Sequence, residues 1–105
     1  MFKDAQKEVD DWVQGYEKPY WEPLSQLARL TEEVGEVSRV LNHMYGQKVK
    51  KDSEEPDELE DELADVLFAV MCLANSHDID LDEAFARIME KSRTRDKDRF
   101  TKKIV

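Results

Sequence analysis

The segment LEDELADVLFAVMCLAN, residues 59–75, decides the fold of this chain. Its first half places apolar residues three or four positions apart among acids, which is the period of an amphipathic helix. Its second half, Val66 to Ala74, is an uninterrupted apolar run of nine residues. A helix that is apolar on every side has to be buried on more than one face. The segment therefore predicts a helix that packs against several neighbours.

The chain around this segment is small and acidic. It has 105 residues, with 25 Asp and Glu against 16 Lys and Arg, and a formal net charge of -9. We expect a single domain over residues 1–105, because this length is near the lower end of the usual range for one core. An acidic chain repels polyanions, so neither nucleic acid nor a membrane surface is an expected partner.

The sequence also predicts a cytoplasmic protein without a membrane span. The apolar run is far shorter than the roughly 20 residues that cross a bilayer. The segment MFKDAQKEVDDW lacks the apolar stretch of a signal peptide, and the single cysteine, Cys72, cannot form an internal disulfide.

The flanking sequence predicts three further helices and no strand. Only three glycines and three prolines interrupt it, and no run alternates apolar and polar residues between turns. Pro23 suits the first turn of a helix, and Asp80 with Glu83 has capping-box spacing for another. We expect helices from residue 2 to about 15, from 23 to 46, from 59 to between 75 and 78, and from 80 into the tail, with a linker at 17–22 and a mobile polar connection at 46–57.

The apolar surface of these helices predicts an oligomer. A lone four-helix chain could hardly cover the third helix, so we expect its outer side, with Phe68 and Met71, to pack against another subunit in a dimer or tetramer. Burial of this helix inside one bundle is the alternative. The second helix carries one stripe expected to face the core: Leu24, Leu27, Leu30, Val34, Val37, Leu41 and Met44.

Four acidic residues form two pairs with the same spacing. Glu33 and Glu36 lie three residues apart on the second predicted helix, and the third helix repeats this spacing with Glu62 and Asp65. Members of such a pair lie about 60° apart on one helix face. Glu33 and Glu62 also border apolar stripes, where carboxylates are rare unless they are paired or bind a metal. Two antiparallel helices would bring the four carboxylates together around divalent cations.

Oxygen ligands select a hard cation, so Mg2+ is the expected occupant and Mn2+ a substitute. A di-iron site is the nearest rival, but it needs Glu-x-x-His pairs, and neither His43 nor His77 has an acid three residues earlier. Arg29 and Arg39, the only bases on the second helix, could pair with acids on their own helix. A solvated acidic face therefore stays an alternative.

The C-terminal residues 91–105 differ in charge from the rest, with seven bases and two acids. Magnesium that is held by a few carboxylates usually completes its shell with waters and substrate phosphates. We therefore expect Lys91 or Arg95 to neutralise the phosphate oxygens of a nucleotide. A solvated basic tail is the alternative.

At these residues the chain resembles the MazG-like nucleoside triphosphate pyrophosphohydrolases, an all-α group. The signature of that family is E-E-x-x-E followed, after a variable gap, by E-x-x-D. This chain reads EEVGE at residues 32–36 and ELAD at residues 62–65. The surrounding segments LARLTEEVGEVSRVLN, DELEDELADVLFAVMCLAN and IDLDEAFARIMEKSRTRDKDRF follow in the order of the family. The resemblance covers nearly the whole chain.

The resemblance implies a four-helix bundle that hydrolyses a nucleoside triphosphate between the α and β phosphates, as nucleotide-pool housekeeping. Glu32 or Glu33 would take a proton from the attacking water. A Lys-Phe-x-x-Arg segment is common in the family, and here Ser92 replaces the aromatic residue between Lys91 and Arg95. The implied Mg2+ ligands are Glu33, Glu36, Glu62 and Asp65.

The base of such a nucleotide would meet residues near the helix ends. Trp21 and Tyr20 could stack on it, and Asn75 could donate or accept a hydrogen bond, although plain packing is equally consistent. The sequence leaves open the preferred base and sugar, the choice between dimer and tetramer, and the number of cations. A non-catalytic helical oligomer that binds metal or nucleotide and regulates a partner is the alternative to an enzyme.

Overall fold

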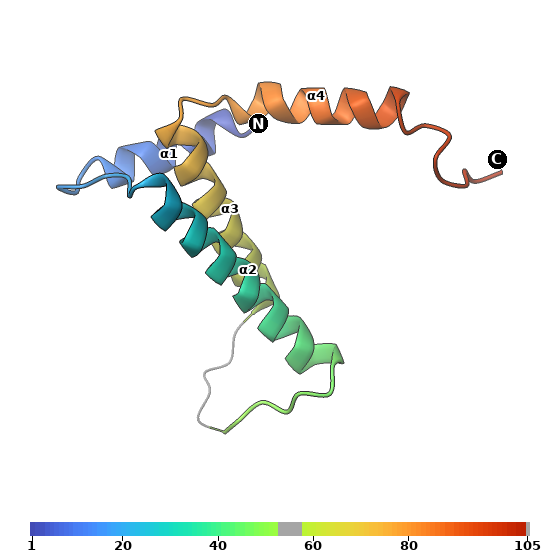
Figure 1. Ribbon diagram of the computed structural model, residues 1–105, viewed down its shortest axis with the longest axis horizontal. Helices are drawn as coiled ribbons and strands as arrows, with labels where there is room; N and C mark the ends of the chain where they lie inside the picture. Colours follow the sequence, from blue (N-terminus) through green and yellow to red (C-terminus); the bar gives the residue numbers. More distant parts are fainter. Residues whose placement is uncertain (53–57, 105) are drawn as a thin grey trace.

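The computed structural model describes residues 1–52 and 58–104, and within them it contains four α-helices and no strand (Figure 1). The all-α prediction is therefore confirmed, and each helix lies within a few residues of its predicted bounds. The connection predicted over residues 46–57 includes residues 53–57, which lie outside the described residues. The helices are α1 (Lys3–Val13), α2 (Pro23–Tyr45), α3 (Leu59–Ser76) and α4 (Leu81–Thr94).

The long helices α2 and α3 form an antiparallel hairpin, and α1 crosses the end of this hairpin where α3 finishes (Figure 1). The core is small and lies mainly where these three helices meet, with Val40 apart from it near the C-terminal end of α2. No helix among the described residues is long and apolar enough to cross a membrane. The buried apolar residues are Val13, Val40, Ala69, Met71, Cys72 and Ala74.

The turn between α3 and α4 is set by backbone hydrogen bonds and a cap. Ile79 N–H donates to the Ala74 carbonyl at 2.9 Å, which is the long bond of a Schellman motif. Asp78 occupies the left-handed position of that motif with φ 55°, where glycine is the usual residue. The Asp80 carboxylate then accepts from the Asp82 N–H at 2.9 Å and starts α4. The predicted N-terminus of the fourth helix is confirmed.

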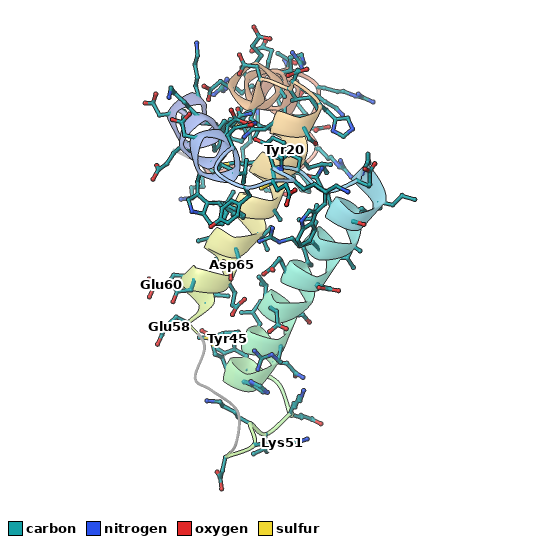
Figure 2. The ribbon with its side chains drawn as sticks, turned by 90° about the vertical axis from the view of Figure 1, so that its left-hand side faces the viewer. Tyr20, Tyr45, Lys51, Glu58, Glu60 and Asp65 are labelled. Carbon is teal, nitrogen blue, oxygen red and sulfur yellow. The ribbon has the colours of Figure 1, made fainter. Side chains whose placement is uncertain are left out.

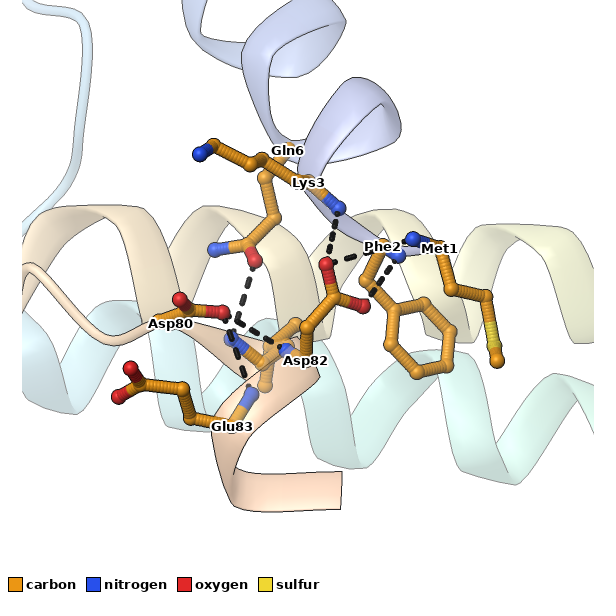
Figure 3. Close-up of polar contacts among 8 residues, drawn as sticks. Met1, Phe2, Lys3, Gln6, Asp80, Asp82 and Glu83 are labelled. Atoms are coloured by element: carbon orange, nitrogen blue, oxygen red, sulfur yellow. Dashed lines mark hydrogen bonds and ion pairs between the residues drawn. The ribbon is translucent and has the colours of Figure 1, made fainter. Parts of the chain in front are cut away.

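Two side chains tie α1 to this turn. Gln6 is buried, and its Nε2 donates to Asn75 Oδ1 and to the Ile79 carbonyl, both at 2.9 Å. Its Oε1 accepts from the Leu81 N–H at 3.1 Å. Asp82, in the first turn of α4, caps the N-terminal end of α1. Its Oδ1 accepts from the Phe2 N–H at 2.6 Å, and its Oδ2 accepts from the Lys3 N–H at 3.1 Å (Figure 3). These contacts fix the direction in which α4 leaves.

Helix α4 runs away from the hairpin, so much of the apolar surface is uncovered in a single chain (Figure 1). The prediction that the α2 stripe faces the core is wrong for most of its residues, because Leu27 and Val34 are each 51% exposed and no helix within residues 1–52 and 58–104 covers that side. An apolar groove of about 350 Å³ lies between α3 and α4. It is lined by Phe2, Leu67, Val70, Met71, Leu81, Ala84, Phe85 and Ile88.

The outward face of α3 also differs from the prediction. Met71 is buried, and Phe68 packs edge-on against Trp12, with ring centroids 6.0 Å apart. Leu63 and Leu67 are the exposed residues instead. The physical reason is the position of α1, whose C-terminal end comes down onto the Phe68 side of α3.

Candidate metal centre and adjoining cavity

Three of the predicted carboxylates come together between α2 and α3. One oxygen each from Glu33, Glu62 and Asp65 lies within 4.8 Å of the others. Glu33 comes from α2, and the other two lie one turn apart on α3, so the cluster exists only because the helices pack antiparallel in this register. Glu62 is only 9% exposed, whereas Asp65 reaches solvent (Figure 2). The chemistry of this donor set fits a hard divalent cation.

The fourth predicted ligand, Glu36, is turned toward its own helix. Its Oε2 accepts from Arg39 Nε at 2.9 Å and from Arg39 Nη2 at 2.7 Å. The local ion pair foreseen for Arg39 is therefore present, and Glu36 is not part of the cluster. Glu32, a predicted proton acceptor, is exposed on α2. The roles of Glu36 and Glu32 stay predictions.

A cavity of about 290 Å³ adjoins the cluster at the α1 end of the hairpin. It includes both aromatic residues predicted to contact a base, Tyr20 and Trp21, which come from the linker between α1 and α2. Figure 2 places Tyr20 near that end and Asp65 further along α3. The full lining is Trp12, Val13, Tyr16, Lys18, Pro19, Tyr20, Trp21, Gln26, Arg29, Phe68, Ala69 and Cys72.

The linker wall of the cavity is anchored by Tyr20. Its hydroxyl donates to Asp10 Oδ1 at 2.5 Å, which fastens the linker to α1. Burial and this hydrogen bond raise the pKa of Tyr20 to about 12, so the hydroxyl keeps its proton at neutral pH. The same contact lowers the pKa of the Asp10 carboxyl.

The helices α2 and α3 contribute a cationic group, Arg29, and a thiol group, Cys72, to the cavity lining. Arg29 stacks against two rings, with its guanidinium carbon 5.4 Å from the Trp21 centroid and 5.0 Å from the Phe68 centroid. Burial raises the pKa of the Cys72 thiol, and the charge of Arg29 opposes this only in part. A thiol in that state is protonated at neutral pH and is a poor nucleophile.

Besides Glu36 and Glu32, three more of the predicted residues lie outside both the cluster and the cavity lining. The amide of Asn75 is engaged with Gln6, since Asn75 Nδ2 donates to the Gln6 carbonyl at 2.9 Å and Asn75 Oδ1 accepts from Gln6 Nε2. Lys91 lies in the last turn of α4 and Arg95 follows directly after it, and this helix runs away from the hairpin (Figure 1). Their contacts with substrate phosphates stay predictions.

Sequence reasoning missed Gln26 and Arg29 as cavity residues. Both stand on α2 before the acidic motif, and Arg29 was expected only to pair with a neighbouring acid. No local signal marks Gln26, because its neighbours Leu24 and Leu27 carry the apolar stripe and are exposed, whereas Gln26 itself is buried.

Fold and site together define a class: a small all-α domain with a carboxylate cluster between antiparallel helices and an aromatic cavity beside it. The family model that matches is the MazG nucleotide pyrophosphohydrolase domain, over residues 22–100. The chain belongs to this family, and it is a nucleotide pyrophosphohydrolase. The alternative of a non-catalytic helical oligomer is thereby set aside.

Relatives and solved structures agree with this membership. Protein YpjD of Bacillus subtilis (strain 168), which is uncharacterized, is 52% identical over 101 residues, covering 96% of this chain and 91% of YpjD. The crystal structure of YPJD from Bacillus subtilis has a TM-score of 0.80 at 49% identity and covers 90% of this chain and 96% of that one. A Bacillus-conserved MazG protein, described as a nucleotide pyrophosphohydrolase, has a TM-score of 0.78 at 46% identity, covering 93% and 95%.

Proposed function

We propose that the protein hydrolyses nucleoside triphosphates between the α and β phosphates, with Mg2+ as cofactor and Mn2+ as a substitute. The observation that carries this proposal is the position of the Glu33, Glu62 and Asp65 oxygens, within 4.8 Å of one another and next to an aromatic cavity. A base in the cavity would direct the triphosphate toward the carboxylates. The products would be a nucleoside monophosphate and pyrophosphate.

The divalent cation and the carboxylates have separate roles in this reaction. When bound, the divalent cation supplies neutralisation of the negative charge on the phosphate oxygens. Glu33, Glu62 and Asp65 would hold this cation. Glu32 or Glu33 takes a proton from the water that adds across the cleaved bond, and the bridging oxygen departs with pyrophosphate. Glu36 joins the ligands if the Arg39 ion pair opens.

The experiment is a product analysis on a panel of ribo- and deoxynucleoside triphosphates, with Mg2+, with Mn2+ and with a chelator. We expect monophosphate and pyrophosphate in equal amounts, and no activity with the chelator. Asp65→Asn should lower kcat/KM by about 100-fold or more, because it removes a ligand charge. Release of a nucleoside diphosphate and orthophosphate would show that cleavage occurs between the β and γ phosphates instead.

We also propose that the active form is a homo-oligomer, dimer or tetramer, in which α4 of one subunit serves another. Two observations support it: the exposed apolar residues of α2 and α3, and the direction of α4, which takes Lys91 and Arg95 away from the carboxylates of its own chain. The basic residues of one copy would then bind phosphates held by the carboxylates of a second copy.

Subunit mixing tests this arrangement. Glu62→Gln and Arg95→Ala are each expected to be inactive alone. After unfolding and refolding together as a dimer, half of the molecules are mixed and each has one intact site, so about a quarter of the wild-type activity should return. No recovery, or a monomer in analytical ultracentrifugation, would contradict the proposal. A cytoplasmic location stays a prediction of the sequence.

A further inference from the structure

The cavity beside the carboxylates has the position and size to take a nucleobase. Arg29 stands one turn before Glu33 on α2, and Phe68 stands one turn after Asp65 on α3. Along both helices the cavity is therefore about 5 to 6 Å from the cluster, roughly the length of the sugar that separates a base from its phosphates. Its volume of about 290 Å³ admits one ring system, whether purine or pyrimidine.

Stacking on the aromatic walls of the cavity would not discriminate among nucleobases. Trp12, Trp21 and Phe68 present ring faces or edges to the cavity. Stacking on such rings tolerates any base, because every base has a π face. Discrimination therefore has to come from polar groups of the lining that can meet the edge of the base.

Arg29 is one such group. Its guanidinium lies over the rings of Trp21 and Phe68. The five N–H donors of a guanidinium point outward in its plane, so stacking on its faces leaves them available. Arg29 donates no hydrogen bond to, and forms no ion pair with, any residue of the described ranges 1–52 and 58–104. It can therefore donate to an acceptor on a ligand.

Gln26 offers the complementary group. It is only 5% exposed, and its Nε2 donates to the Trp21 carbonyl at 2.9 Å and to Ser76 Oγ at 3.0 Å. Because a backbone carbonyl can only accept, this orientation of the amide is fixed. Gln26 Oε1 is then left buried without a hydrogen-bond partner among the described residues. A buried acceptor without a donor is costly, and a ligand N–H would remove that cost.

We propose, on the basis of the function proposed above, that Arg29 and Gln26 select bases with a lactam edge, a carbonyl next to a ring N–H. Arg29 donates to the carbonyl, and Gln26 Oε1 accepts from the N–H. Guanine, hypoxanthine, uracil and thymine have this edge. Adenine and cytosine carry an amino group next to a bare ring nitrogen, so donor meets donor at Arg29 and acceptor meets acceptor at Gln26.

Two pairs of substrates isolate this edge. Deoxyinosine and deoxyadenosine triphosphates differ only there among purines, and deoxyuridine and deoxycytidine triphosphates differ only there among pyrimidines. We expect the wild-type kcat/KM to favour the lactam member of each pair by about tenfold or more. Equal values within both pairs, or a preference for the amino members, would overturn the proposal.

Arg29→Met keeps the apolar stem and removes the donors, so the ratio within each pair should fall toward one. Lys18→Met is the matched control, because Lys18 also lines the cavity as a cation but pairs with Glu22 at 3.8 Å; its ratios should stay at the wild-type value. An equal loss for all four substrates in Arg29→Met would assign Arg29 to the phosphates or to folding and overturn the proposal.

Equilibrium binding separates this inference from the proposed reaction. The corresponding monophosphates are titrated against tryptophan fluorescence, with Trp12 and Trp21, which both line the cavity, as the reporters. If no triphosphate is cleaved but deoxyinosine monophosphate still binds about tenfold tighter than deoxyadenosine monophosphate, the proposed function fails and the base selection stands. Gln26→Met should weaken the lactam monophosphates selectively, with thermal melting as the check on its fold.

Discussion

Binding of Mg2+ to the carboxylate cluster should stabilise the fold by an amount that can be calculated. The oxygens of Glu33, Glu62 and Asp65 lie within 4.8 Å of one another. Two negative charges at that separation repel by about 3 kcal/mol at an effective dielectric constant of about 20, and by about 1 kcal/mol in bulk water. A divalent cation replaces this repulsion by attraction, so the folded chain binds it and the unfolded chain binds it far less well.

The size of the stabilisation follows from linkage. At a free Mg2+ concentration of about 100 times the Kd, the free energy of unfolding rises by about 2.7 kcal/mol. For a chain of this length such a change raises Tm by roughly 10 °C. The assay is differential scanning fluorimetry of protein freed of metal by a chelator and titrated with MgCl2, with KCl at matched ionic strength as the control for screening.

Two variants of the same type locate the effect. Glu62→Gln removes the most buried carboxylate of the cluster, so the Mg2+-dependent rise in Tm should be lost. Glu60→Gln makes the same chemical change on α3 at an exposed position that points away from α2 (Figure 2), and it should keep the full rise. Equal responses of the two variants to Mg2+, or no rise in the wild type, would refute the assignment of the site.

Three further predictions concern the contacts that hold α1, the linker and α4. The pKa of Tyr20 is raised to about 12, so its contribution to stability is present below pH 10 and is lost as the pH rises through 12; Tyr20→Phe should remove this alkaline step and one tyrosinate absorbance transition. The pKa of Asp82 is lowered, mainly by the Phe2 N–H, so its contribution is present at neutral pH and is lost as the pH falls through the folded-state pKa; Asp82→Asn should lower Tm at pH 7 more than at pH 3. Asp78→Ala should destabilise the fold by about 1 kcal/mol in urea unfolding, because alanine tolerates a positive φ less well, whereas Asp78→Gly should not.

The helices could be predicted from the sequence because their signals are local. Pro23 at the first turn of α2 and the cap at Asp80 act within a few residues, and the apolar period is a property of each helix alone. The same period does not say what covers an apolar face. Val34 has the spacing of a core residue, yet it is half exposed, because the spacing records that one face of the helix is apolar and does not record whether another element covers that face.

The candidate site was predictable to a similar degree. Spacing placed Glu62 and Asp65 on one face, and antiparallel packing brought Glu33 to them. Spacing could not show that Glu36 is held by Arg39, because an acid three residues from a base can serve either a metal or that base. The contacts of Arg29 were beyond prediction for a different reason: the rings that stack on it come from the linker and from α3.

The junction at Asp82 gives α4 the mechanics of a lever. The helix has 14 residues, so its arm is about 21 Å long, and a tilt of about 10° at its base moves the tip by about 4 Å. A displacement of that size decides whether a cationic side chain touches a phosphate or misses it. The hydrogen bonds of Asp82 with Phe2 and Lys3 therefore determine the position of the basic residues at the C-terminal end of α4, although these bonds lie at its N-terminal end.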